Sequence, residues 1–192
     1  MSADWQAVLD FWLGAEDLPQ YGKPRPEWFR KSQAFDDEIR SRFEPVYEGA
    51  VRGELDHWRG QPRSALALVI VLDQFPRNIY RGTPRAFAAD PLALDVARHM
   101  VAQGYDRRLN AVERLFVYLP FEHAEDLETQ RESVRLFESL RGEPYSEEGI
   151  DYAYRHYAII ERFGRFPHRN AILGRPSTPE EIEFLKQPGS SF

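Results

Sequence analysis

Signals that start and stop helices recur along this sequence, and they constrain the fold more than any other feature does. Asp90-Pro91 precedes an apolar period of three to four residues that ends at Gly104, and Asn110 with Glu113 has the spacing of a capping box. Thr178-Pro179 is a further start signal, followed directly by two glutamates. No segment shows the convincing period-two alternation of a half-buried strand. The pattern predicts an all-α fold of eight or nine helices packed as antiparallel pairs.

Residues 64–75 are the one segment where a strand competes with a helix. The triplet 69–71 is Val-Ile-Val, and β-branched residues favour strands. The run is rich in Ala and Leu at its start, however, and continues through Asp73 to its aromatic end. That length and composition favour a helix, which is the structure we expect here.

Prolines are expected to interrupt the helices at three places. Proline has no N–H to donate, and its ring clashes with the preceding turn. Pro45 should kink the helix whose apolar face runs from Phe35 to Tyr47. Two other helices should end before Pro76 and before Pro120.

Length, charge and cysteine content limit the classes of protein to which the chain can belong. Its 192 residues are enough for a single helical domain over residues 1–192. The net charge of -6 gives no support for a nucleic-acid partner. The absence of cysteine excludes disulfides, thiolate metal sites and cysteine nucleophiles. The N-terminus lacks a leader pattern and every apolar run is too short to span a membrane, so we expect a cytoplasmic protein without a membrane partner.

Aromatic residues are expected to dominate the core, because they make up 14% of the chain. Ten large apolar residues at helical spacing are the predicted core, and most of them should be buried. They are Trp5, Phe11, Trp12, Phe43, Leu72, Leu115, Phe116, Leu136, Phe137 and Ile160.

Two similar Phe-Pro elements, at residues 74–81 and 165–172, are the most informative motifs for function. Each contains Phe-Pro, then Arg-Asn, an aliphatic residue and a further Arg (Arg81 and Arg175), and each precedes a Thr-Pro helix start. Guanidinium groups can bind carboxylate or phosphate through two hydrogen bonds, which favours an anionic ligand. The alternative is that these side chains tie loops to buried carboxylates and helix ends. The candidate binding residues are Arg77, Asn78, Arg81, Arg165, Arg169 and Asn170.

A second cluster of polar residues lies where one helix should end and the next begin, at residues 120–126. Glu122 and Asp126 are four apart and would share a helix face, so Glu122 and His123 are candidate catalytic residues together with His168. The alternative role is capping, with acids stabilised at a helix N-terminus. No set of residues has metal-ligand spacing, and neither a nucleophile elbow nor a dinucleotide-binding pattern is present, so we predict no metal site and identify no cofactor.

Four strings in the sequence resemble the bacterial domain-of-unknown-function family 924. They are VLDFW at 8–12, LDQFPRN at 72–78, YLPFEHAED at 118–126 and RFGRFPHRN at 162–170. The resemblance covers residues 5–185. It implies a tetratricopeptide-like fold, a right-handed α-α superhelix, and it brings no established activity, cofactor or catalytic residue.

Two functional hypotheses follow. In the first, a polar cleft formed by the candidate residues binds an anionic small molecule and acts on it by general acid–base chemistry. In the second, the concave face of a tetratricopeptide-like array binds a protein or peptide partner, and the Arg-Asn turns are purely structural. We prefer the first, because ionisable and amide side chains cluster beside prolines and no repeat groove is evident. Only the first hypothesis makes the protein an enzyme.

Overall fold

The computed structural model describes residues 4–191, and within that range the chain folds into helices with no strand. The α-helices are α1 (Trp5–Leu13), α2 (Gln33–Val51), α3 (Pro62–Val69), α4 (Phe75–Ile79), α5 (Asp90–Ala102), α6 (Ala111–Glu122), α7 (Leu127–Glu138), α8 (Glu147–Phe163) and α9 (Pro179–Phe184). Short 3₁₀ turns cover Pro26–Trp28, Asp56–Gly60, Pro84–Phe87, Asp106–Arg108 and Pro167–Arg169. The all-α prediction is confirmed. The prediction that the N-terminus lacks a leader pattern rests partly on residues 1–3, which lie outside the described residues.

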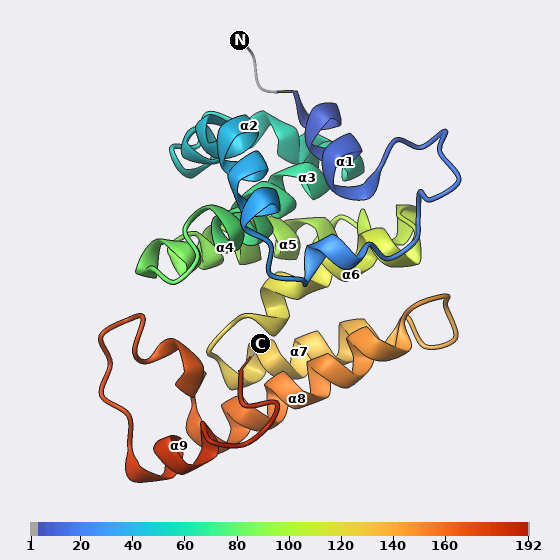
Figure 1. Cartoon of the computed structure of the whole chain (residues 1–192). Coiled ribbons are helices and arrows are strands. Elements are labelled where there is room, and N and C mark those ends of the chain that lie inside the picture. Colours follow the sequence, from blue (N-terminus) through green and yellow to red (C-terminus); the bar gives the residue numbers. More distant parts are fainter. Residues whose placement is uncertain (1–3, 192) are drawn as a thin grey trace.

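Consecutive helices pack against each other along much of the chain. α5 contacts α6, α6 contacts α7, and α7 contacts α8, while α1 packs on α3 and α2 on α4. Figure 1 shows α1 to α6 in one group and α7, α8 and α9 in a second group across from α6. The chain after α8 turns back toward the first group before α9 (Figure 1). Within residues 4–191, no helix is both long enough and apolar enough to cross a membrane.

Aromatic rings form the centre of the core, as predicted. Trp12 lies 5.6 Å from Phe75 and 5.8 Å from Phe116, measured between ring centroids, and Trp28 lies 4.8 Å from Phe116. Most of the predicted core is buried: Trp12, Phe43, Leu72, Phe116, Leu136, Phe137 and Ile160. The other three, Trp5, Phe11 and Leu115, are partly exposed and pack on the edge of the same cluster.

Residues 62–79 form one continuous helix, so the prediction that a helix ends before Pro76 is wrong. A π-helical turn, Ile70–Gln74, joins α3 to α4, and the Phe75 N–H donates to the Ile70 carbonyl five residues earlier. Pro76 lies just after the π turn, where the regular pattern of helical hydrogen bonds is already changed. Over residues 4–191, counting α3 to α4 as one helix gives eight helices and counting them separately gives nine, which agrees with the predicted number.

The prediction that a helix ends before Pro120 is also wrong. α6 continues through Pro120 to Glu122, because this proline removes only one hydrogen bond close to the helix end. α8 ends at Gly164, whose φ of 69° is left-handed and ends the helix before Phe166-Pro167 is reached. Pro45 lies inside α2. Ends set by local caps were predictable, as the capping boxes at Asn110 and Thr178 show.

Gly149 of α8 lies so close to neighbouring helices that we expect Gly149→Ala to destabilise the protein by about 1–3 kcal/mol. A Cβ there would lie 2.8 Å from Leu115 Cδ2 and 3.2 Å from Phe137 Cε1. This clash should outweigh the gain of about 1 kcal/mol in helix propensity that alanine normally brings. Urea unfolding monitored by circular dichroism measures the difference.

The matched control is Gly49→Ala in α2. A Cβ at that position would meet only Glu54 Oε2, 3.1 Å away at the end of a flexible side chain that can move. This variant should be as stable as the parent or more so. Equal stability of the two alanine variants would show that α8 has room beside Gly149 and would contradict the close packing.

Candidate functional site

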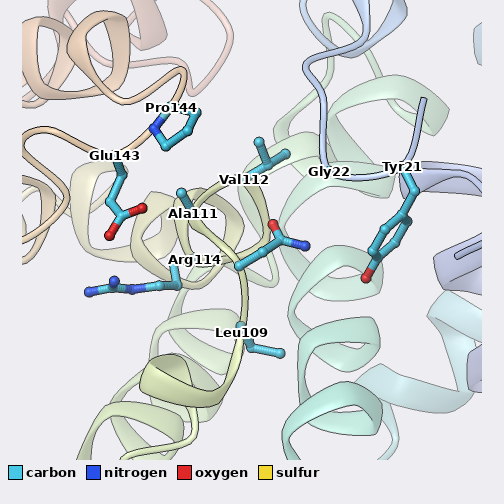
Figure 2. A pocket seen from close by; sticks show the side chains of 9 residues that line it. Tyr21, Gly22, Leu109, Ala111, Val112, Arg114, Glu143 and Pro144 are labelled. Carbon is cyan, nitrogen blue, oxygen red and sulfur yellow. The ribbon is translucent and has the colours of Figure 1, made fainter. Parts of the chain in front are cut away.

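One surface pocket, at the start of α6, is large enough for a small molecule, but most of its polar groups serve the structure. Figure 2 shows this pocket, of about 410 Å³, lined by Tyr21, Gly22, Leu109, Asn110, Ala111, Val112, Arg114, Glu143 and Pro144. The Tyr21 hydroxyl donates to Glu113, Asn110 belongs to the capping box of α6, and Arg114 donates to Tyr118 and Ser139. These side chains hold α6 in place. We therefore place the candidate site elsewhere.

The second pocket, of about 360 Å³, lies where four segments meet, and we call it the α5–α6 pocket. Its polar side chains come from the start of α5, the end of α6 and the 3₁₀ turn that follows α8: Asp90, His123, Glu125 and Arg169. The rest of its lining is apolar: Pro84, Phe87, Ala88, Pro91, Leu94, Pro120, Ala124 and Leu173. A mostly apolar cavity with a few converging polar groups is the usual form of a small-molecule site.

His123 is the pocket residue best placed for proton transfer. Its Nδ1 lies 2.7 Å from Asp73 Oδ1, and Asp73 is completely buried. An ionised carboxylate only accepts hydrogen bonds, so Nδ1 carries the proton and Nε2 carries the lone pair. Within residues 4–191, Nε2 makes no hydrogen bond. The result is a neutral imidazole whose basic nitrogen is available at the pocket wall, where the side chain is 14% exposed.

Charges around this pair fix the two protonation states. Burial and the charge of Arg77 lower the pKa of His123 below its ordinary value and outweigh the attraction of Asp73. The pKa of Asp73 is held low against the effect of burial, because Arg77 and His123 stabilise its negative charge and Gln74 donates to its other oxygen over 2.6 Å. At neutral pH, Asp73 is therefore ionised and His123 is uncharged.

Asp90, the first residue of α5, joins the arginines of the two Phe-Pro elements. Arg77 donates to both carboxylate oxygens of Asp90, over 2.9 and 3.1 Å, and to the Asp73 carbonyl over 2.6 Å. Arg169 approaches the same carboxylate over 3.3 Å. The structure thus brings Arg77, Arg169 and His123 together, with Asp73 and Asp90 between them.

Arg169 is the guanidinium in this cluster with the least complete hydrogen bonding. The residue is only 7% exposed, and its Nε is buried without a hydrogen-bond partner. The rings of Phe87 and Phe166 lie 4.6 and 4.7 Å from its guanidinium carbon. Burial, followed by repulsion from Arg77, lowers its pKa to about 10, which still leaves it charged at neutral pH. A buried cation with unused donors on a pocket wall is suited to an anion.

Glu122 and His156 form a second pair beside His123, and both are buried. Burial and the negative charge of Asp73 raise the pKa of Glu122 well above its ordinary value, and burial lowers the pKa of His156 to about 3. His156 Nδ1 lies 2.9 Å from the Tyr152 carbonyl and 3.1 Å from Glu122 Oε1. A carbonyl only accepts, so Nδ1 is the protonated nitrogen of a neutral ring. Glu122 therefore lies behind the pocket as an uncharged acid.

Four of the predicted binding residues tie the two Phe-Pro elements to other helices. Asn78 and Arg81 donate to Asp36 of α2, Asn78 over 2.7 Å and Arg81 over 2.7 and 2.8 Å. Arg165 and Asn170 do the same to Glu181 of α9, over 2.7 Å from Arg165 Nε and 3.2 Å from Asn170. In both elements an Arg and an Asn share one carboxylate. The loop-tying alternative therefore describes these four side chains.

The remaining predicted residues lie near the pocket or form caps. Burial lowers the pKa of His168 to about 4, and its ring lies 5.7 Å from that of Phe166. The predicted shared face of Glu122 and Asp126 is wrong, because α6 ends at Glu122 and Asp126 caps α7 by accepting from the Thr129 N–H. Glu125 is bound by Arg175 through two hydrogen bonds of 2.6 and 2.8 Å.

The site contains two carboxylates that sequence reasoning missed. Asp73 interrupts an apolar run, and a charged residue in such a run is a signal for a buried partner. Asp90 was read only as a helix start, although its side chain joins both arginines. Among residues 4–191, no group of three or more His, Asp or Glu side chains is arranged to hold a metal ion.

Comparisons with known proteins place the chain among relatives of unknown function. The family model described as "Bacterial protein of unknown function (DUF924)" matches residues 8–189. A solved structure from Agrobacterium tumefaciens, described as a protein of unknown function, is similar with a TM-score of 0.84 and 41% identity, covering 95% of this chain and 96% of that one. No curated protein matches the chain.

Proposed function

The chain belongs to the DUF924 family of bacterial proteins of unknown function, and from that premise we propose that it binds a small organic anion in the α5–α6 pocket and moves a proton on it. One observation carries the proposal. A neutral histidine oriented by a buried aspartate and a buried arginine with unused donors line the same pocket. A positioned base and a positioned cation are the two parts that general base catalysis on an anion needs.

The chemistry assigned to each residue follows from its protonation state. Arg169 binds the anionic group of the ligand through a charge-assisted hydrogen bond. His123 Nε2 accepts a proton from a C–H or O–H bond of the ligand, whose electron pair stays on the ligand. The imidazolium formed is stabilised by Asp73, 2.7 Å from Nδ1. The proton on Nε2 then returns to the ligand, or it first exchanges with water so that a solvent proton is delivered to the ligand instead; in both cases the ligand is reprotonated and the ring is neutral again.

Glu122 and His156 keep the base in its reactive state under this proposal. Burial favours the neutral form of both groups, so neither brings a charge next to His123. Arg77 has a positioning role, because its donors are used by Asp73 and Asp90. Asn78, Arg81, Arg165 and Asn170 take no part in the reaction.

We expect Arg169→Gln to weaken binding of organic anions at least tenfold, because one charge-assisted hydrogen bond contributes about 1.5–3 kcal/mol. The protein would be screened by thermal shift against small carboxylates and inorganic phosphate, and each hit measured by calorimetry. Arg165→Gln is the matched control, since that guanidinium binds Glu181 and Pro176 rather than lining the pocket. A hit that binds folded Arg169→Gln as tightly as the parent would overturn the site.

Proton transfer has a separate readout. In D₂O, His123 should remove a proton from a bound ligand and return a deuteron, which raises the ligand mass by about one unit per exchanged site. His123→Gln should still bind the ligand and should lose the exchange. Exchange at the parental rate in His123→Gln would assign the base to another group. If no bound anion exchanges, the proton-transfer part of the proposal is wrong and the protein only binds the anion.

A further inference from the structure

We infer that the anion bound in the α5–α6 pocket is a monocarboxylate with an apolar body, and not a phosphate. The inference rests on the proposed function and adds to it the chemical class of the ligand. Three features of the pocket carry it: the number of available cationic donors, the local charge balance, and the apolar lining.

Arg169 is the guanidinium of the cluster that lines the pocket, and it has the most unused donors. Arg77 uses its Nη groups on Asp90 and on the Asp73 carbonyl. Arg175 is engaged by Glu125, Asn170 and the Phe166 carbonyl. Arg169 makes one long hydrogen bond, of 3.3 Å, and its Nε has no partner. One arginine edge matches one planar carboxylate, whereas a phosphate offers three charged oxygens that need further donors.

Charge balance limits the ligand to a single negative charge. The carboxylates of Asp73, Asp90 and Glu125 are matched by the guanidiniums of Arg77, Arg169 and Arg175, and His123 is neutral. A phosphate ester carries about −1.5 to −2 at neutral pH. It would bring that charge next to two pocket carboxylates, Asp90 and Glu125, in a partly buried site. A carboxylate adds only about half to two-thirds of the negative charge that a phosphate ester would add.

The lining predicts what the rest of the ligand looks like. Phe87, Leu94, Pro120 and Leu173 are apolar residues of the lining, and Phe87 also lies against the Arg169 guanidinium. A volume of about 360 Å³ is within the range of small-molecule sites and is far larger than a lone anion requires. Apolar carbon atoms attached to the carboxylate would fill the pocket and would be transferred out of water.

The test is a series of straight-chain carboxylates, from acetate to octanoate, compared with inorganic phosphate by calorimetry on the full chain. Affinity should rise about fourfold per added methylene until the pocket is full. Phosphate should bind at least tenfold more weakly than hexanoate. Leu173→Ser should reduce the gain per methylene, while Arg169→Gln should weaken every carboxylate by a similar factor.

The outcomes separate this inference from the proposal on which it rests. If phosphate binds as tightly as hexanoate, or chain length has no effect, and Arg169→Gln still weakens binding, the ligand class is wrong and the anion site stands. If neither the carboxylates nor phosphate binds, both are wrong. If Leu173→Ser binds the whole series like the parent, the apolar body lies elsewhere and the assigned ligand class is overturned.

Discussion

Asp90→Ala is expected to destabilise the protein by about 3–5 kcal/mol, because it leaves buried guanidinium charge without its carboxylate. Arg77 loses two hydrogen bonds, of 2.9 and 3.1 Å, and Arg169 loses its contact of 3.3 Å. Arg77 keeps its contact with Asp73. Arg169 keeps only its packing against Phe87 and Phe166, which does not neutralise it. The loss would be measured as the free energy of unfolding in urea.

Asp95→Ala is the matched control for Asp90→Ala. Asp95 lies on the same helix, its side chain is 66% exposed, and it pairs with Arg59 over 2.7 Å. An exposed pair of this kind contributes about 0–1 kcal/mol. The two alanine variants should therefore differ by at least about 2 kcal/mol.

A double variant tests whether the loss comes from the unpaired charge. In the Asp90→Ala background, Arg169→Gln should cost less than it does alone, because it then removes a buried cation that has no partner. Additive losses would mean that Asp90 and Arg169 do not act on each other. Asp90 would then stabilise the protein mainly through Arg77, which donates to both of its carboxylate oxygens.

The parts of the fold that depend on neighbouring residues could be predicted from the sequence. The capping boxes at Asn110 and Thr178 are formed by side chains three residues apart, and the structure has both. The helix at residues 64–75 was also predictable, because its length outweighed the β-branched triplet. Each of these features is decided within one or two turns of the chain.

Features that depend on distant residues were not predictable. Asp36 is bound by Asn78 and Arg81 from more than forty positions away, and no pattern in the sequence links them. The π turn before Pro76 is similar: it adds one residue to the helical turn next to Asp73, whose side chain meets His123. Proline rules describe an isolated helix, and here the surrounding structure determines how the helix continues past the proline.

In the candidate site, too, some features could be predicted from neighbouring residues and others depend on distant ones. Carboxylate partners within the protein were one of the two alternatives for the arginines next to the Phe-Pro pairs, and the structure has such partners in both elements. The residue type alone could not show which of the two arginines has more carboxylate partners. Arg77 and Arg169 stand at matching positions of the two elements, but Arg77 has two carboxylates and a carbonyl, while Arg169 shares one carboxylate. That difference arises from packing and carries the proposed function.

Phe116→Ala is also expected to cost about 3–5 kcal/mol, from the lost transfer energy of the ring and from the cavity left behind. Phe116 is 1% exposed, and its ring lies 5.8 Å from Trp12 and 4.8 Å from Trp28, both edge to face. The neighbouring rings cannot move easily into the space, because Trp28 Nε1 donates to the Trp12 carbonyl over 2.7 Å and fixes the indole.

Phe29→Ala serves as the control for the loss of an aromatic ring. Phe29 follows Trp28 directly and is 76% exposed, so its removal should change the free energy of unfolding by less than about 0.5 kcal/mol. Phe116→Leu should fall between the two, because it keeps part of the buried volume. A loss below about 1 kcal/mol for Phe116→Ala would mean that the three-ring contact does not hold α6 against α1. The pocket at the far end of α6, where His123 lies, would then need another source of rigidity.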